Sequence, residues 1–270
     1  MRETMSQSKS SRREALRAQQ EAEARAAKRK KLLGVIAGLV VIAVAVVAVV
    51  VGIDRHRSSQ QAQQATGAQV TPPNADPKTG IITVNADTAK SGVPTLTIYQ
   101  DYQCPNCKNA EDTYGPSIKA LAASGDIKLQ YWTLTFLDTN FRNDASYRAS
   151  MAAAAAAMVG KYSDYHDTIY KNQPAEEGDG YTDEQLRNTF AADAGITGEN
   201  LTKFQKYYDT KATSAFAKNS AAKGLAEGSK LEDQFGTPFF TVNGKPYTGW
   251  QSITNPTAAS LLASIKSAAG

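Results

Sequence analysis

The sequence has little cysteine and little histidine, with two residues of each among 270. A structural zinc site usually takes four cysteine or histidine ligands, and His56 and His166 are the only histidines that could join the two cysteines. Covalent haem attachment needs a histidine directly after the second cysteine, and this chain has Lys108 there. The scarcity of these residues therefore argues against a zinc site and against attached haem.

A chain of this length can bury a substantial core, so it does not need disulfides in order to fold. The two cysteines, Cys104 and Cys107, nevertheless stand together as "CPNC", with Pro105 and Asn106 between them. A bridge between them closes a loop of only four residues and removes little entropy from the unfolded chain. Reversible thiol–disulfide exchange is the favoured explanation, and a purely structural bridge is the weaker alternative.

An excess of positive charge is confined to the N-terminus. Residues 1–31 contain ten Lys and Arg against four Asp and Glu, whereas residues 54–270 contain twenty against twenty-two. Between them, residues 32–53 form an uncharged apolar run, which as a helix extends about 33 Å and can cross a bilayer. A cleaved signal peptide, the competing interpretation, has a shorter apolar region of about 7–15 residues. We therefore predict a transmembrane helix at 32–53.

The charges that flank this run set its predicted orientation. "KRKK" precedes it, and two arginines, Arg55 and Arg57, follow it. The positive-inside rule then places residues 1–31 in the cytoplasm and the large C-terminal part outside, on a single-pass protein of the cell membrane. Because topology accounts for the basic charge, we expect no nucleic-acid partner. Residues 54–79 are rich in Gln, Ala, Ser and Pro and are predicted to be a flexible tether.

The folded part, predicted at 80–270, begins with strands and continues with helices. β-Branched and aromatic content predicts strands at 81–86, 95–102 and 127–137. The Gly115-Pro116 pair predicts a kink in the helix that follows the second strand. Helices are predicted over about 142–232, with a capping box at Thr182 and Gln185. Asn243-Gly244 predicts a hairpin, and the last helix is predicted to have Asn255 as its cap and Pro256 at its first position. This order predicts a layered α/β fold with an inserted helical domain.

The cysteine pair lies where the second predicted strand runs into a helix. Pro105 suits the first helical position, which places Cys104 at a helix N-terminus. Unpaired backbone N–H groups and the helix dipole favour a thiolate there, so we expect the pKa of Cys104 to fall below about 8.5. Cys107 lies one turn further in. We predict Cys104 to be the exposed nucleophile and Cys107 the shielded, resolving thiol.

Three features together resemble the DsbA-like thioredoxin-fold oxidoreductases, in the membrane-anchored form of actinobacteria: "CPNC" after a strand, the helical insertion, and Thr237-Pro238 ahead of an Asn-Gly hairpin. The resemblance implies a thioredoxin fold over residues 80–270 with a cis peptide at Thr237-Pro238 beside Cys104. It also implies that this loop binds the extended backbone of a substrate. From the residues alone, Pro238 could instead begin an edge strand.

This chain departs from the family pattern at two positions. Many relatives carry His where Asn106 stands, so we expect a less depressed Cys104 pKa and a less oxidising couple here. The family also tends to place a buried acid six residues before the nucleophile, where this chain has Ile98. Either Asp101 or a water molecule could replace that acid as a proton relay. Asp101 could instead be a solvated or capping carboxylate.

The leading functional hypothesis is an extracytoplasmic enzyme that introduces disulfides into unfolded secreted or envelope proteins with free thiols. It uses no cofactor of its own, and the resemblance implies a quinone-linked membrane reoxidant. One alternative is a thiol reductase or disulfide isomerase that a membrane electron donor keeps reduced. Another is a non-catalytic envelope adaptor that binds peptides near Pro238.

Overall fold

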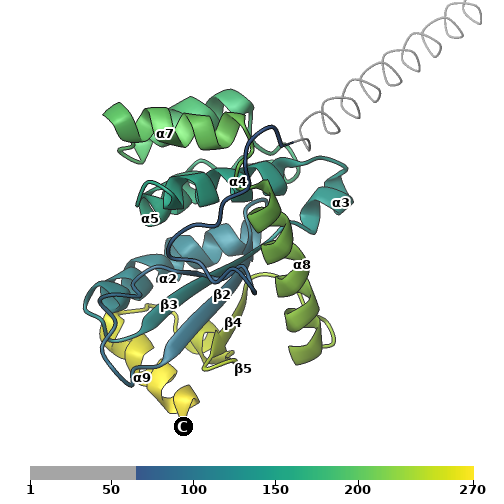
Figure 1. The fold of residues 1–270 in the computed structure, drawn as a ribbon. Helices are drawn as coiled ribbons and strands as arrows, with labels where there is room; N and C mark the ends of the chain where they lie inside the picture. The colour runs from purple at the N-terminus through teal and green to yellow at the C-terminus, as the bar shows by residue number, and fades with distance from the viewer. Residues whose placement is uncertain (1–64) are drawn as a thin grey trace, which may run out of the picture. The chain divides into compact units, whose positions relative to one another are not determined.

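A computed structural model describes residues 65–270 of the chain (Figure 1). The predicted cytoplasmic segment, the predicted transmembrane helix at 32–53 and the first part of the predicted tether lie outside the described residues. Within residues 65–270, none of the helices has the length and apolar character that crossing a bilayer requires.

A five-stranded sheet of order β1-β3-β2-β4-β5 forms the centre of the described part. Its two long strands, β2 (Thr95–Asp101) and β3 (Lys128–Leu134), are parallel neighbours, and the other pairings are antiparallel. The short strands are β1 (Ile82–Thr83), β4 (Phe239–Val242) and β5 (Lys245–Pro246). All three predicted early strands are present, each shorter than predicted, and β2 and β3 are largely buried because helices cover both faces.

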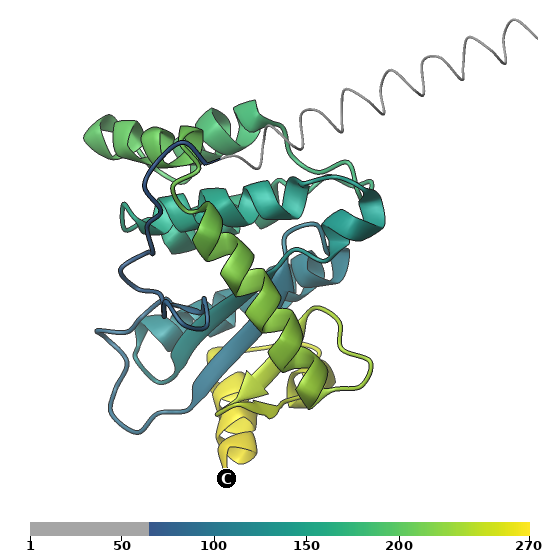
Figure 2. The ribbon, with the colours of Figure 1, turned by 45° about the vertical axis from the view of Figure 1, so that its right-hand side comes forward.

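The two faces of the sheet are covered by different helices. Helices α2 (Pro105–Ala123) and α9 (Ala258–Ala269) contact each other, and α2 covers the face that carries Ile98. Helix α8 (Ser214–Leu231) crosses the other face (Figure 2), where Trp132 Nε1 donates to Ser220 O at 3.0 Å. Although Pro116 lies inside α2, the helix is continuous from its first residue to its last. The Gly115-Pro116 pair therefore does not interrupt this helix.

The helical insertion lies between β3 and β4. It contains α3 (Leu137–Phe141), α4 (Ala145–Ala157), α5 (Tyr162–Lys171), the π-helix η1 (Gln185–Thr189), α6 (Phe190–Asp193) and α7 (Gly198–Asp209), and α8 follows it. Helix α4 contacts α5, α7 and α8, and its alanine run at 152–157 is completely buried. Small side chains let these helices approach closely. The predicted capping box before η1 is present, since Thr182 N and Gln185 Oε1 lie 2.8 Å apart.

The segment 65–79 corrects the prediction of a flexible tether over 54–79. Gly67 N donates to Thr210 O at 3.1 Å, and Val70 N donates to Ala212 O at 2.9 Å. The side chain of Gln69 accepts from Ala215 N at 2.7 Å. These partners belong to the loop between α7 and α8 and to the start of α8. Segment 65–79 is therefore part of the folded domain, because its backbone groups find partners distant in sequence that its composition does not reveal.

The C-terminal elements confirm one prediction and correct another. Asn243 and Gly244 have positive φ angles of 51° and 79° and join β4 to β5, as the hairpin signal predicts. The last helix, however, has Thr257 as its N-cap. Thr257 Oγ1 accepts from Ser260 N at 3.1 Å, and Ser260 Oγ accepts from Thr257 N at 3.0 Å. This reciprocal capping box satisfies two helix-end donors. The predicted cap at Asn255 is therefore wrong, and Pro256 precedes the cap and is not the first helical residue.

Candidate active site

The end of β2 leads directly into the cysteine pair. Strand β2 ends at Asp101, and Cys104 is the N-cap of α2, in an extended conformation with Pro105 directly after it. Cys104 O accepts from the backbone N–H groups of Cys107 and Lys108 at 3.1 and 3.2 Å. The structure thus places Cys104 at the helix N-terminus, as predicted.

Cys104 and Cys107 are free thiols with unequal environments. The pKa of Cys104 is lowered to about 6, first by a hydrogen bond from the Cys107 thiol, which outweighs the opposing effect of burial. Thr237 and the backbone N–H groups of Cys107 and Asn106 lower it further. The predicted direction is confirmed, but the neighbouring thiol contributes more than the helix end does. Asn106 contributes through its backbone.

Cys107 differs from Cys104 in the sign of its pKa shift. Its side chain is 3% exposed, and burial raises its pKa well above the ordinary value, with a further increase from the Cys104 thiolate beside it. Cys104 is 6% exposed and is therefore less open than predicted. At neutral pH the pair carries one thiolate on Cys104 and one thiol on Cys107.

The Thr237-Pro238 peptide bond is cis and lies against Cys104. When Cys104 is protonated, its thiol donates to Thr237 O at 3.2 Å. The Thr237 hydroxyl is buried and has no hydrogen-bond partner in the dithiol form, so it can donate to the Cys104 thiolate. Pro238 directly precedes β4. The structure therefore brings together two segments that are more than a hundred residues apart in sequence.

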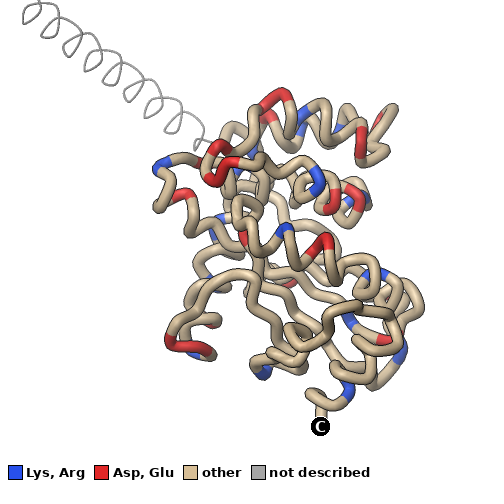
Figure 3. The backbone as a smooth tube through the Cα atoms, turned by 180° about the vertical axis from the view of Figure 1, so that it is seen from behind, with Lys and Arg blue, Asp and Glu red and all other residues tan. Residues whose placement is uncertain are grey.

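A groove of about 430 Å³ adjoins this loop. It lies between the first turns of α2, the Thr237-Pro238 loop and the 3-10 helix η2 (Gly249–Ser252). Trp250 packs edge-on against Tyr114, with ring centres 5.2 Å apart. The residues that line the groove are all uncharged, although Lys, Arg, Asp and Glu are spread over the described helices (Figure 3). Sequence reasoning missed Tyr114 and Trp250 as groove residues, because no local pattern links them.

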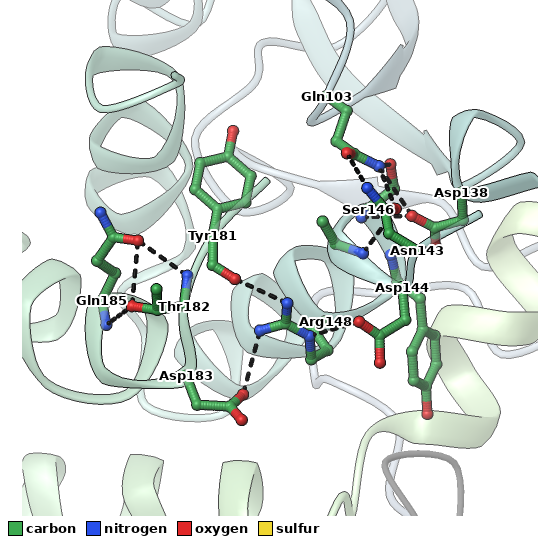
Figure 4. Close-up of polar contacts among 12 residues, drawn as sticks. Gln103, Asp138, Asn143, Asp144, Ser146, Arg148, Tyr181, Thr182, Asp183 and Gln185 are labelled. Carbon is green, nitrogen blue, oxygen red and sulfur yellow. Dashed lines mark hydrogen bonds and ion pairs between the residues drawn. The ribbon is translucent and has the colours of Figure 1, made fainter. Parts of the chain in front are cut away.

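A buried polar network, which shares no residue with the groove, holds the chain directly before Cys104, and Figure 4 shows its members Gln103, Asp138, Asn143 and Ser146. We call it the carboxylate network and define it by Asp101, Gln103, Asp138, Asn143 and Ser146. Gln103 Nε2 lies 2.9 Å from Asp138 Oδ1, 3.0 Å from Asn143 Oδ1 and 2.8 Å from Ser146 Oγ. Asp138 also accepts from Ser146 N at 2.8 Å. These contacts connect the active-site turn to α3 and α4.

Asp101 is completely buried within this network. It accepts from Ser146 Oγ, from Gln103 N at 3.0 Å and from Leu137 N at 3.2 Å, where α3 begins. Burial raises the pKa of Asp101 to about 6 and that of Asp138 to about 7. The interpretation of Asp101 as a solvated carboxylate is therefore wrong. Its bond to Leu137 N agrees with the capping interpretation.

The backbone of the turn is held by side chains of the helical insertion. Tyr170 OH donates to Asp101 O at 3.2 Å, and Tyr181 OH donates to Tyr102 O at 2.6 Å. Gln173 Nε2 donates to Cys104 O at 3.1 Å. The insertion thus fixes the position of the turn from which the cysteines project. None of these side chains belongs to a sequence motif that could have identified it.

Comparison with known proteins agrees with this geometry. The model of the thioredoxin family matches residues 89–265. The fold is similar to that of MdbA, a thiol-disulfide oxidoreductase from Corynebacterium diphtheriae, with 20% identity, coverage of 75% of this chain and 96% of that one, and a TM-score of 0.54. Reduced DsbA from Mycobacterium tuberculosis is 24% identical, with coverage of 71% and 93% and a TM-score of 0.51.

A third structure is the reduced disulfide bond oxidoreductase DsbG from Mycobacterium tuberculosis. It is 25% identical, with coverage of 73% of this chain and 90% of that one and a TM-score of 0.51. Among curated proteins, no sequence matches the chain significantly. The chain belongs to the thioredoxin family and, within it, resembles the DsbA-like protein thiol-disulfide oxidoreductases.

Proposed function

We propose that this chain is a membrane-anchored, extracytoplasmic thiol:disulfide oxidoreductase that introduces disulfides into secreted or envelope proteins. Cys104 is its nucleophile and Cys107 its resolving thiol. The observation that carries the proposal is the geometry of the pair: Cys104 is the N-cap of α2 and contacts Thr237 of the cis Thr237-Pro238 peptide, and Cys107 is buried one turn further in. The lowered pKa of Cys104 and the raised pKa of Cys107 agree with it. Membership of the thioredoxin family supports it.

The reaction starts from the disulfide between Cys104 and Cys107. A client thiolate attacks Cys104 Sγ, the bond between the two cysteines breaks, and a mixed disulfide forms between the client and Cys104. A second client thiolate then attacks the client sulfur of that bond, and Cys104 leaves as a thiolate. The client is oxidised by two electrons, and the pair is reduced to the dithiol.

The stabilised Cys104 thiolate favours this direction over the reductase alternative. A thiol of low pKa is a good leaving group, and stabilising it in the reduced pair makes the disulfide more oxidising. The two electrons must then pass to a reoxidant, for which we propose a quinone-linked membrane protein. Thiol alkylation in intact cells separates the alternatives, because an oxidase rests mainly as a disulfide and a reductase rests mainly as a dithiol.

The groove beside Thr237-Pro238 suits clients of varied sequence. Its uncharged lining does not select for charged side chains, and an extended client strand can be bound through its main chain. We propose that Thr237 and Pro238 bind the client segment next to its reacting cysteine. Clients are then chosen by an accessible thiol and an unfolded backbone.

The anchor at 32–53 places this chemistry outside the cytoplasm. Its support is the uncharged apolar run and the basic residues before it. Protease treatment of intact spheroplasts tests the topology, because an extracytoplasmic domain is digested while the N-terminal segment is protected. Protection of the cysteine-containing domain would contradict it.

Trapping of clients tests the proposed reaction. The Cys107→Ala variant cannot resolve a mixed disulfide from within, so clients should accumulate as adducts that a reducing agent releases. A Cys104→Ser, Cys107→Ala double variant is the matched control and should trap none. If the single variant traps no more protein than the double variant, Cys104 is not a client-reactive thiol.

A further inference from the structure

The Thr237-Pro238 loop connects α8 to β4 through residues 232–238, which contain no helix or strand. Cys104 Sγ and Thr237 O lie 3.2 Å apart, and this contact links the loop to α2. Asp233 and Gln234, near the start of the loop, are exposed, and their side chains form no hydrogen bond or ion pair within the described residues. Packing contacts must therefore hold the loop beside Cys104.

Two phenylalanines of the loop region pack on one tyrosine ring. Phe235 lies two residues before Thr237, and its ring packs edge-on against that of Tyr99 in β2, with centres 5.6 Å apart. Phe239 directly follows Pro238, and its ring packs edge-on against the same tyrosine at 5.5 Å. The two phenylalanine rings also contact each other at 5.3 Å. Tyr99 thus contacts both ends of the short segment that carries Thr237 and Pro238.

Tyr99 belongs to a row of aromatic side chains that crosses the sheet. It pairs in register with Trp132 of β3 on one side and with Phe239 of β4 on the other. The rings of Tyr99 and Trp132 are stacked, with centres 5.1 Å apart. Successive residues of a strand point to opposite faces, and Pro238 and Phe240, the neighbours of Phe239, lie on the α2 face with Cys107. The aromatic row therefore holds the loop from the face opposite to the cysteines.

Two glycines of α8 make room for two of these rings. Gly224 and Gly228 lie four residues apart, on the same face of the helix. A Cβ atom at Gly228 would overlap Cε2 and Cζ of Phe235. A Cβ atom at Gly224 would lie 2.9 Å from Cδ1 of Trp132. Each ring therefore occupies space that a larger residue would fill, which explains two glycines in a helix interior, where glycine is unfavourable.

We propose that Phe235 is a positioning residue that holds the Thr237-Pro238 loop beside Cys104. It packs between Gly228 of α8 and the ring of Tyr99, in a cluster that contains neither cysteine. It acts through the loop, because it keeps the Thr237 hydroxyl within reach of the sulfur and keeps Pro238 in the wall of the groove. The effect on the thiolate does not require the proposed function, whereas the effect on clients rests on it.

The pH dependence of iodoacetamide alkylation at Cys104 tests this role in the full-length reduced protein. Gly228→Ala pushes the phenylalanine ring away from α8, so the midpoint should rise by about half a unit, because Thr237 then stabilises the thiolate less. The substitution favours the helix, so the fold should persist. Cys107 and Asp101, titratable groups that interact with Cys104, lie outside the aromatic cluster and are not altered.

Removal of the ring gives a second test. Phe235→Ala should raise the midpoint by about the same half unit. Addition of Gly228→Ala should then have no further effect, because no ring is left to displace. The combination of Phe235→Ala with Thr237→Val should give little more than Thr237→Val alone, since Phe235 acts through Thr237. Shifts that add in both pairs would contradict the positioning role.

Gly224→Ala is the matched control. It makes the same change in the same helix, but it displaces the ring of Trp132, which does not belong to the loop. The midpoint should stay within about 0.2 units of the wild-type value. A wild-type midpoint in both Gly228→Ala and Phe235→Ala would overturn the proposal. An equal rise in Gly224→Ala would also overturn it, because any loosening of the cluster would then have the same effect.

Oxidation of clients measures the second consequence. Phe235→Ala should raise KM for a reduced, unfolded client about 5-fold, because a less ordered groove wall loses more entropy on binding. Oxidation of a small dithiol should change by less than about 2-fold. Equal loss with both substrates would overturn the effect on the groove. If the wild type oxidises no client, the proposed function fails, while the alkylation series still decides the role of Phe235.

Discussion

On one side of Cys104, the groove presents uncharged residues of α2, η2 and the Thr237-Pro238 loop. On the other side, the carboxylate network places the buried acids Asp101 and Asp138 among amides and hydroxyls that tie the turn to the helical insertion. No charged residue lines the groove, so the groove does not select clients by charge. The network side makes many specific bonds, and a change there leaves buried polar groups without partners.

This difference separates the two roles that the site must fill. The side toward the client has to accept many sequences, so it relies on backbone geometry and shape. The side toward the insertion has to hold one turn in one position, so it relies on directional hydrogen bonds. Changes on the network side should therefore act on stability, and changes on the groove side should act on clients and on the thiolate.

The largest expected effect of a single substitution is on the network side, at Gln103. Gln103→Ala removes the amide that hydrogen-bonds to the side chains of Asp138, Asn143 and Ser146. Because these groups are then left without that partner inside the protein, the free energy of unfolding should fall by about 3 kcal/mol. Urea unfolding of the oxidised protein measures it. The Cys104 pKa should stay within about half a unit. A large pKa change with unaltered stability would reverse the assignment of the two sides.

The pH dependence of stability should reveal the same network. The folded pKa values of Asp101 and Asp138, about 6 and about 7, lie above the unfolded value of about 3.9, so the folded state binds more protons in the interval between. Stability should therefore fall as pH rises from about 4 to about 7, by about 3 kcal/mol for Asp101 alone. Urea unfolding across this range measures it.

The control for this pH effect is Asp101→Asn, which removes one of the two carboxylates. Whatever its constant cost in stability, the variant should show a shallower decrease between pH 4 and pH 7. An identical slope in the wild type and in the variant would mean that Asp101 does not titrate in this range.

A smaller effect is expected on the groove side, at Trp250. Trp250 lines the groove and packs against Tyr114 and Phe240. Trp250→Ala should raise KM for oxidation of a reduced, unfolded client about 10-fold, or about 1.4 kcal/mol, because part of the groove wall is lost. Oxidation of a small dithiol, which does not need the groove, should be nearly unchanged. Equal loss with both substrates would contradict a client-binding role.

The smallest expected effect is that of Thr237→Val. The substitution keeps the shape of the side chain but removes the hydroxyl that lowers the pKa of Cys104. That pKa should therefore rise by less than about one unit, and unfolding free energy should change by less than about 1 kcal/mol. The pH dependence of alkylation measures the first quantity. A thiolate titration that does not move would assign Thr237 to client contact alone.

The parts of the site that sequence predicts are those with local signals. Pro105 after Cys104 indicates a helix N-terminus, and Asn243-Gly244 indicates a tight hairpin; both features are present. The Thr237-Pro238 loop required the family resemblance, because the more than one hundred residues between it and Cys104 contain no pattern that predicts their contact.

The parts that sequence did not predict depend on distant partners. Gln103 and Asp138 are 35 residues apart, and Gln69 and Ala215 are 146 apart. Periodicity describes one element at a time, so it reveals neither the carboxylate network nor the docking of segment 65–79. The error at Asn255 has a local cause, since a plausible cap competed with the better capping box at Thr257 and Ser260 two residues later.

The central claim is that Cys104 is a stabilised thiolate at neutral pH. The rate of iodoacetamide alkylation at Cys104, followed against pH in the reduced protein, tests it directly. We expect a midpoint near pH 6. We expect a higher midpoint in Cys107→Ala, because this substitution removes the thiol that contributes most to the lowered pKa of Cys104. A wild-type midpoint near about 8.5, the value of an ordinary free thiol, would contradict it.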